Sequence, residues 1–356
     1  MHKGVIYALL AAALFGASTP FAKVLVGQVA PVALAGVFYL GSGLGLLACF
    51  IVRALAVRNS AERPAALTAA DLPWLGGATM FGGIAGPVLL MIGLSLTPAS
   101  SASLLLNMEG VLTALLAWFV FKENFDRRIF AGMLLIVIAG VLLSWEQIPV
   151  LGVPWGALAI VGACLCWGID NNLTRKVSAS DALQIACIKG LAAGSVNIGI
   201  ALALGFRLPD LPTMLTAGIV GFCGYGVSLV MFVLALRHLG TARTGAYFSA
   251  APFVGAVISL LMLGEVPGLV FWLAAALMGA GIWLHLTESH QHAHTHDPMA
   301  HTHAHEHDAH HQHEHDVDGH DVVWDGKKTH VHAHSHTDLR HAHAHYPDIH
   351  HRHGHE

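Results

Sequence analysis

The sequence predicts an all-α polytopic membrane protein of ten transmembrane helices, built as two inverted five-helix repeats and followed by a disordered C-terminal tail. Its 356 residues are 55% hydrophobic and 11% charged, whereas soluble domains carry about 25% charged residues. The mean hydropathy is +0.61. Apolar runs also recur along the chain, and about 20 such residues are needed for a helix to cross a bilayer.

The apolar runs define the predicted spans in order. The connections between them are short, and the longest, 53–72, is rich in charged residues. The first run is too long for the apolar part of a signal peptide and further runs follow it, so we interpret it as a retained span. The ten runs are 4–26, 32–52, 73–95, 99–121, 128–145, 155–174, 182–205, 213–236, 243–263 and 267–286.

The distribution of basic residues orients these spans through the positive-inside rule. With the N-terminus in the cytoplasm, the cytoplasmic connections hold eleven Lys and Arg residues, and the outer connections hold only Lys23 and Arg207. An even number of spans returns the chain to its starting side. We therefore expect a multi-pass protein of the cell (inner or plasma) membrane with both termini in the cytoplasm.

Two pairs of segments indicate an internal repeat. Residues 96–123 align without gaps with 238–265 at an offset of 142, and 14–23 align with 166–175 at an offset of 152. Each half then has five spans, and because five is odd the halves enter the membrane with opposite topology. Inverted repeats are a transporter architecture whose substrate site lies near the midplane. The predicted division is 1–145 for the first repeat, 146–289 for the second and 290–356 for the tail.

Three stretches carry a resemblance to a known family. They are "SLTPASSASLLLNMEGVLTALLAWFVFKENFDRRIFAGMLLIVIAGVLL" (95–143), its echo "LRHLGTARTGAYFSAAPFVGAVISLLMLGE" (236–265) and "CWGIDNNLTRK" (166–176). Together they resemble the drug/metabolite transporter superfamily, specifically its EamA-type family of ten-helix transporters. The resemblance implies two five-helix domains, cytoplasmic termini and a cavity between the halves. It says little about substrate, because such transporters move amino acids, nucleotide-like metabolites, amines and drugs.

One departure from the family pattern lies beside a charged residue. Many members have Pro where this chain has Gly110, and the second half keeps it as Pro252. The neighbouring Glu109 lies near the middle of its span, and the aligned residue in the other half is Ala251. A charge inside a span costs at least about 2.5–3.5 kcal/mol and marks functional sites. We expect Glu109 to be a proton-coupling group or a cation ligand; the alternative is a carboxyl group hydrogen-bonded across helices.

Asp170 and Lys189 are the other charged residues well inside predicted spans. Asp170 precedes the end of its run by about five residues and Lys189 follows Asp181 by about eight, so their depths along the two helices are similar. We hypothesise an Asp170–Lys189 ion pair on the inner side of the cavity, acting either as a gate or as a structural pair. Asn171 and Asn172 add polar groups, which either line the cavity or cap the helix.

Small and proline residues suggest where helices approach closely or bend. Glycines concentrate in 73–95 and 213–236, where packing is the default interpretation. Prolines in spans remove backbone donors and can kink helices at a cavity. The two acidic residues that end the aligned segments are expected to cap helices or hold inter-helix contacts. These residues are Pro20, Pro87, Pro252, Glu123 and Glu265.

The tail has an unusual composition, with 24 of the 27 histidines in 290–356. Neutral imidazole suits Ni²⁺, Co²⁺, Zn²⁺ and Cu²⁺, and a flexible chain offers several sites of low selectivity. A purification tag and a pH-responsive polar tail are the alternatives, although the length and interspersed acids argue against a tag. The densest candidate metal ligands are His301, His303, His305, His307, His310, His311, His313 and His315.

The sequence favours a gradient-driven secondary transporter over an enzyme. No phosphate-binding loop or nucleophile motif occurs, no cofactor is required, and no nucleic-acid partner is expected. The expected partners are the lipid bilayer and a small solute, and the sequence leaves open whether the protein forms a homodimer. The leading hypothesis is an exporter of a small solute with a metal-binding tail. The alternatives are a Ni, Co or Zn transporter whose tail captures or senses the cargo, and a membrane-tethered metal store.

Overall fold

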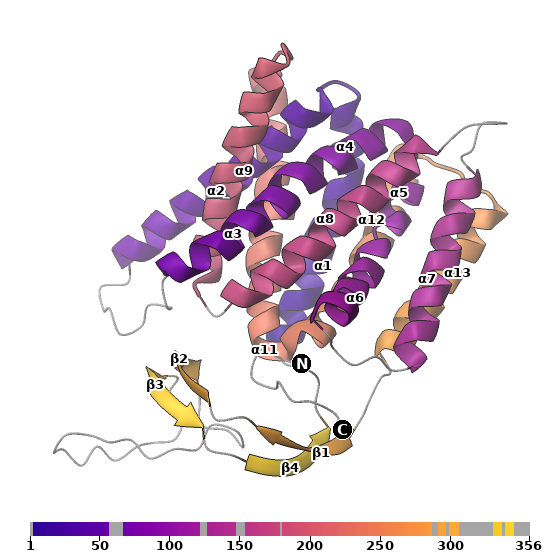
Figure 1. Ribbon diagram of the computed structural model, residues 1–356. Coiled ribbons are helices and arrows are strands. Elements are labelled where there is room, and N and C mark those ends of the chain that lie inside the picture. The colour runs from indigo at the N-terminus through magenta and orange to yellow at the C-terminus, as the bar shows by residue number, and fades with distance from the viewer. Residues whose placement is uncertain are drawn as a thin grey trace.

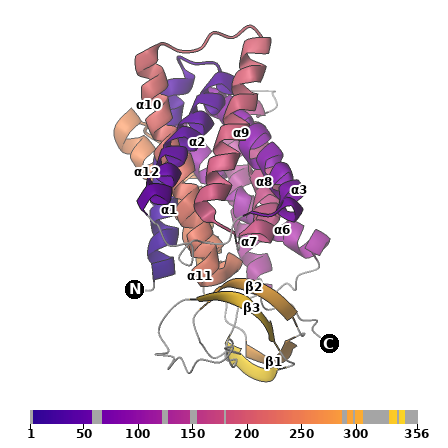
Figure 2. The same cartoon turned by 90° about the vertical axis from the view of Figure 1, so that its left-hand side faces the viewer.

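The protein is a bundle of helices, and the described part of the tail holds four short strands (Figure 1). The computed structural model describes residues 3–56, 67–121, 127–146, 154–178 and 180–286, and within the tail 291–296, 299–305, 330–336 and 339–344. The start of α1 and the end of α13 lie at the same end of the bundle, here called the N-terminal end (Figures 1 and 2).

The helices follow the order of the predicted spans. The first half contains α1 (Lys3–Val26), α2 (Pro31–Ala56), η2 (Ala69–Asp71), α3 (Leu72–Ala78), η3 (Thr79–Ala85), α4 (Gly86–Leu96), α5 (Ala99–Leu105), α6 (Met108–Phe121) and α7 (Arg127–Glu146). The second half contains α8 (Trp155–Val177), α9 (Ala182–Ala203), α10 (Leu211–Gly221), η4 (Phe222–Val227), α11 (Ser228–Phe248), α12 (Ala251–Leu263) and α13 (Leu269–Leu286).

Apolar length supports a membrane-spanning bundle and confirms the predicted fold class. Six stretches within the described residues are long and apolar enough to cross a membrane: Lys3–Val26, Pro31–Leu55, Ala69–Leu96, Trp155–Val177, Ala182–Ala203 and Leu211–Leu239. Shorter apolar helices cover Phe130–Ser144, Ala251–Leu263 and Leu269–Leu284. Large apolar side chains such as Leu261 and Trp272 are exposed on the outside of the bundle, as expected for surfaces that face lipid.

Matching irregularities occur in the two halves. The π-helical segments η3 and η4 interrupt the third span of each half, 143 residues apart. The fourth spans are broken between α5 and α6 and between α11 and α12. At each break a polar side chain donates to a carbonyl of the preceding helix, Asn107 to Leu104 O at 3.1 Å and Ser249 to Gly245 O at 2.9 Å. Pro252 lies in the first turn of α12, where its missing N–H costs no helical hydrogen bond.

One predicted boundary is wrong. We expected a connection between 213–236 and 243–263, but α11 continues through this region to Phe248. The basic residues there, Arg237 and Arg243, suggested a loop because charges usually collect outside spans. They are compatible with a helix that extends beyond the apolar layer, and the break falls instead at Ser249–Ala250, before Pro252.

The first helix of each half packs against the third and fourth spans of the other half. Helix α1 packs against α11 and α12, and α8 packs in the same way against α4 and α6. The aligned residues Gly16 and Gly168 lie at these contacts, close to the backbones of Ala251 and of Leu112–Thr113. Helices α2 and α9 cross where Gly43 meets Gly190, and a Cβ at either glycine would collide with the partner's backbone. Small residues at such crossings allow close approach without a hydrophobic driving force.

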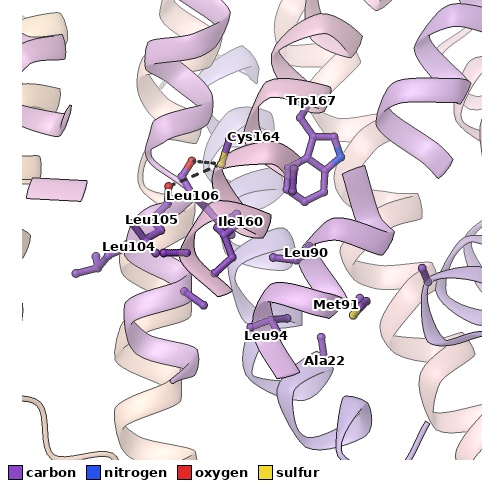
Figure 3. Close-up of a cluster of buried hydrophobic side chains, with 14 of the residues drawn as sticks. Ala22, Leu90, Met91, Leu94, Leu104, Leu105, Leu106, Ile160, Cys164 and Trp167 are labelled. Atoms are coloured by element: carbon purple, nitrogen blue, oxygen red, sulfur yellow. Dashed lines mark hydrogen bonds between the residues drawn. The ribbon is translucent and has the colours of Figure 1, made fainter. Parts of the chain in front are cut away.

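The apolar core joins α4, α5 and α8 beside the first break (Figure 3). Ile160, Cys164 and Trp167 lie on one side of α8 and are buried among leucines of α4 and α5. The Cys164 thiol lies 3.7 Å from Leu105 O and 3.9 Å from Leu106 O. This cysteine therefore combines apolar packing with a weak hydrogen bond to carbonyls next to the helix break.

The tail strands form two antiparallel ladders. Strand β1 (Gln291–His296) pairs with β4 (Leu339–Ala344), and β2 (Met299–His305) pairs with β3 (His330–His336). A two-stranded ladder is at best marginally stable alone in water. The tail thus has no folded domain of its own within the described residues, in line with its low apolar content.

Candidate functional site

A partly open cavity lies in the bundle between elements of both halves. It offers about 70 Å³ of space to water-sized molecules, which is room for several waters or a small charged group. Its walls come from α1, α2, α6, α8, α9, η4 and α11. The lining residues are Phe15, Tyr39, Glu109, Trp167, Asp170, Asn171, Lys189, Gly224, Tyr225, Ser228, Leu229, Phe232 and Phe248.

The ion pair hypothesised from the sequence is present in this cavity. Lys189 Nζ lies 2.6 Å from Asp170 Oδ1 and 2.8 Å from Oδ2, and only 1% of Lys189 is exposed. Thr174 Oγ1 donates to Asp170 Oδ1 at 2.8 Å, one turn along α8. The pair joins α8 to α9 within the second half. Because each charge is neutralised and hydrogen-bonded, it can lie inside the protein.

The π-helical segment η3 packs directly against Asp170 of this ion pair. A Cβ at Gly82 would lie 2.7 Å from Asp170 Cβ and closer still to its carboxylate. The Gly82 carbonyl accepts hydrogen bonds from Tyr39 Oη at 2.7 Å and Trp167 Nε1 at 3.0 Å. The next carbonyl, that of Gly83, accepts from Asn197 Nδ2 at 3.1 Å. A π-helical turn shifts carbonyls out of the regular helix pattern, and here side chains of α2, α8 and α9 use them.

Glu109 faces the same cavity from the first helical turn after the break. It is the second residue of α6, and its side chain is partly buried. Glu109 Oε1 accepts a hydrogen bond from Asn171 Nδ2 at 2.7 Å. Among the residues that the structure describes, no donor is recorded for Glu109 Oε2. Glu109, Asn171, Asp170 and Lys189 are thus brought together, although the sequence suggests only the contact between Asp170 and Lys189 and the asparagines beside it.

Asn172 lies apart from this group. Its amide donates to Gly168 O at 2.8 Å and to Thr113 O at 3.4 Å. The bond to Thr113 O attaches α8 to α6, whereas the bond to Gly168 O lies within α8. Asn172 does not line the cavity. Adjacent helical residues point about 100° apart, so Asn171 and Asn172 face different neighbours. This arrangement corresponds to neither of the two roles considered for Asn172, cavity lining and helix capping.

Sequence reasoning missed the aromatic walls of the cavity. Phe15 contacts Trp167, Tyr225 and Phe248 with ring centroids 5.7, 5.8 and 5.6 Å apart. Phe232 and Phe248 are 4.9 Å apart. A signal existed, because the repeat alignment pairs Phe15 with Trp167 and each precedes a glycine. Aromatic residues are ordinary core residues, however, so this alignment alone did not single them out.

Polar contacts between the halves lie toward both ends of the bundle. At the N-terminal end, Arg53 of α2 pairs with Asp181, which also caps α9 by accepting from Leu183 N at 3.0 Å. Arg237 donates to Ser180 O at 2.9 Å beside this pair. These contacts join α2, the start of α9 and α11.

At the other end, Lys23 donates to Leu94 O and Thr97 O at the end of α4. Glu265 accepts from the backbone N–H groups of Ala99 and Ser100. Glu265 from the second half therefore caps α5 of the first, as expected for an acid at a span end. Its counterpart Glu123 lies outside the described residues.

No metal site is formed by the side chains that the structure describes. Within them, no three His, Cys, Asp or Glu residues are grouped so as to hold a metal ion. Of the candidate tail ligands, three lie on β2, where His301, His303 and His305 pair with His334, His332 and His330 in register. The remaining candidates lie outside the described residues: His307, His310, His311, His313 and His315.

The inverted pairing of helices, the lipid-exposed apolar surface and the charged interior cavity define a multi-pass membrane transporter. The EamA-like transporter family model matches residues 2–145 and 154–287, once in each half. The chain belongs to the EamA-like transporter family.

Similar proteins carry only general descriptions. An uncharacterized transporter of Methanothermobacter thermautotrophicus is 25% identical over 300 residues, covering 79% of this chain and 85% of that protein. The uncharacterized transporter YyaM of Bacillus subtilis is 23% identical, covering 79% and 95%. A solved crystal structure shares the fold with a TM-score of 0.58 and 16% identity, covering 78% of this chain and 94% of that one.

Proposed function

We propose that this transporter is a gradient-driven carrier that exports a small solute across the cell membrane, with Glu109 as the proton-coupling carboxylate. The observation that carries the proposal is the environment of Glu109. Its carboxylate faces the cavity, accepts a hydrogen bond from Asn171 and has no basic partner among the described residues. An acid in such a place can take up and release a proton as the cavity opens to either side.

The other titratable groups near Glu109 are already engaged. Asp170 is bound by Lys189 and Thr174, the Cys164 thiol contacts backbone carbonyls, and the Tyr39 hydroxyl donates to Gly82 O. A proton arriving in the cavity therefore meets Glu109 as the available acceptor. The break before α6 supports the same role, because interrupted helices commonly form the sites of transporters.

Orientation and direction complete the proposal. The excess of basic residues on one side favours cytoplasmic termini. In this proposal the protein lies in the cell membrane, and the N-terminal end of the bundle and the tail face the cytoplasm. If solute and proton compete for Glu109, protons entering the cell drive the solute out. Export is then the direction expected in a cell with an inward proton gradient.

Proteoliposomes containing the full chain test the coupling role. A panel of labelled amino acids and amines is offered with and without an imposed pH gradient. Glu109→Gln is expected to lose gradient-driven accumulation, because a neutral amide cannot exchange a proton. Asp210→Asn is the matched control, since Asp210 is exposed and its side chain makes no helix-capping bond. Unchanged accumulation by Glu109→Gln would refute the coupling role.

A second candidate function concerns the tail, which we propose to be a metal-binding segment. The register of β2 and β3 supports it, because three histidines of one strand pair directly with three of the other. This register brings histidines of two neighbouring strands side by side, and imidazole ligands suit Ni²⁺, Co²⁺, Zn²⁺ and Cu²⁺. The metal is then cargo, regulator or stored ion.

Transport by the full chain and by a chain ending at residue 289 separates these roles. Uptake of Ni²⁺, Co²⁺ and Zn²⁺ is measured beside uptake of the organic panel. Metal transport that falls on removal of the tail supports capture of a cargo metal. Organic transport by both forms, with no metal transport by either, would eliminate the metal-carrier alternative and leave regulation or storage for the tail.

A further inference from the structure

We propose that the cavity binds a small organic cation, with its ammonium group between the carboxylate of Glu109 and the aromatic walls. This inference rests on the proposed carrier function and names the class of solute. It follows from three features of the lining: its net charge, the engagement of its basic residue and the abundance of aromatic rings.

The first feature is the charge of the cavity. The charged lining residues are Glu109, Asp170 and Lys189. Lys189 contacts both oxygens of Asp170, so these two charges cancel at short range. The charge of ionised Glu109 is left over. A partly enclosed cavity with one uncompensated carboxylate favours a single positive charge, because a carboxylate withdrawn from water is costly without a partner.

The second feature limits binding of anions and zwitterions. Lys189 is the one basic side chain among the described residues that line the cavity. It is 1% exposed and is held by Asp170 and by Thr174 Oγ1 at 3.4 Å. A solute carboxylate would have to break this pair to gain a cationic partner. The cavity therefore discriminates against amino acids relative to the corresponding amines.

The third feature is the set of aromatic rings. Six of the thirteen lining residues are aromatic, and ring contacts made by Phe15, Tyr225 and Phe248 connect all six. An ammonium group within about 6 Å of a ring centroid is attracted to the ring face, and more strongly where water is excluded. The rings also accept the alkyl or aryl part of the solute, so the lining suits a cation with an apolar body.

Competition for Glu109 links this site to transport. A proton and an organic cation each neutralise the same carboxylate, so binding of one weakens binding of the other. Solute binding should consequently weaken as the pH falls, because more carriers hold the proton. The groups near Glu109 on neighbouring elements already have hydrogen-bond partners. On α8, Asn171 donates to Glu109 itself, Asp170 accepts from Thr174 and the Cys164 thiol contacts Leu105 O. On α2, Tyr39 donates to Gly82 O.

Two series of shape-matched probes test the proposal by calorimetric binding to the full chain in nanodiscs. The first is choline, its neutral analogue 3,3-dimethylbutan-1-ol and its zwitterionic analogue glycine betaine. The second is 2-phenylethylammonium, 2-phenylethanol and phenylalanine. In at least one series the cation is expected to bind about tenfold or more tightly than both analogues. Equal or weaker binding of the cation in both series overturns the proposal.

Variants assign the binding to the cavity. Glu109→Gln should reduce affinity for the preferred cation by about tenfold and leave the neutral analogue unchanged, and Phe232→Leu should weaken the cation more than the neutral analogue. Phe130→Leu is the matched control, because Phe130 is exposed on α7. Cation binding that survives both cavity substitutions unchanged also overturns the proposal.

The two proposals fail separately. If cations bind selectively but Glu109→Gln still accumulates solute with the pH gradient, the coupling role fails and the solute class stands. If Glu109→Gln loses gradient-driven accumulation but cations bind no better than their analogues, the solute class fails and the coupling role stands.

Discussion

Phe15 and Trp167 occupy equivalent positions in the two repeats, and their rings meet edge to face with centroids 5.7 Å apart. The approximate twofold relationship between the halves therefore passes through the cavity. The charged residues beside this contact do not obey it, because Glu109 is matched by Ala251. A nearly symmetric scaffold thus surrounds an asymmetric set of charged groups that line the cavity.

The Asp170–Lys189 pair should behave as a unit. Asp170→Asn alone leaves the Lys189 ammonium buried without a counter-ion, and breaking a buried pair costs about 3–5 kcal/mol. Lys189→Met alone leaves the carboxylate unpaired. The double variant removes both charges and should recover most of the lost stability. Thermal unfolding in detergent measures this, and a double variant less stable than either single one would contradict it.

Gly82 should be intolerant of a methyl group. Gly82→Ala presses a Cβ into Asp170 and displaces the ion pair, and overpacking of this kind costs about 1–3 kcal/mol. Gly76→Ala is the matched control, because nothing lies within 4 Å of a Cβ at that position. The control should gain up to about 1 kcal/mol from helix propensity. Unfolding temperatures of the two variants that shift equally would contradict the expected contact.

Two substitutions at Asp181 separate its two roles. Asp181→Asn removes the ion pair with Arg53 but keeps a good N-cap for α9, and should cost at most about 1 kcal/mol because Arg53 is partly exposed. Asp181→Ala removes the cap as well and should cost about 1 kcal/mol more. Unfolding measurements on both variants check this order. Equal losses would mean that capping contributes nothing.

Removal of the tail should leave the helical bundle intact. A chain ending at residue 289 keeps every helix of the bundle, so its stability should stay within about 0.5 kcal/mol of the full chain. Ni²⁺ should not raise the unfolding temperature of the shortened chain, because the described side chains of the bundle form no metal site. A large nickel-dependent shift in the shortened chain would reveal a metal site in the bundle.

The charged core of the site could be predicted because its residues are costly inside a membrane. Asp170 and Lys189 lie at matching depths on consecutive helices, and this is enough to suggest their contact. The relationship of Glu109 to Asn171 depends on how α6 and α8 cross, which the sequence does not specify. The hypothesis of polar groups near Asp170 nevertheless included Asn171.

The π-helical segments and the course of α11 could not be predicted in the same way. Glycines in η3 and η4 suggest close packing, but hydrogen-bond shifts within a helix leave no distinct pattern of apolar residues. The residues after Leu236 look like a loop because they are basic. Their helical course is set by the break at Ser249–Ala250 and by packing against the start of α1, where Tyr7 stacks near His238.

The unequal helix breaks have a consequence for the resting equilibrium of the carrier. In an inverted repeat of identical halves, the inward-open and outward-open states would be exchanged by symmetry and would have equal free energies. Glu109 and Gly110 at one break, against Ala251 and Pro252 at the other, remove that equality. We therefore expect the empty transporter to favour one orientation, and the residues proposed to bind solute and proton would also determine which side of the membrane its cavity faces at rest.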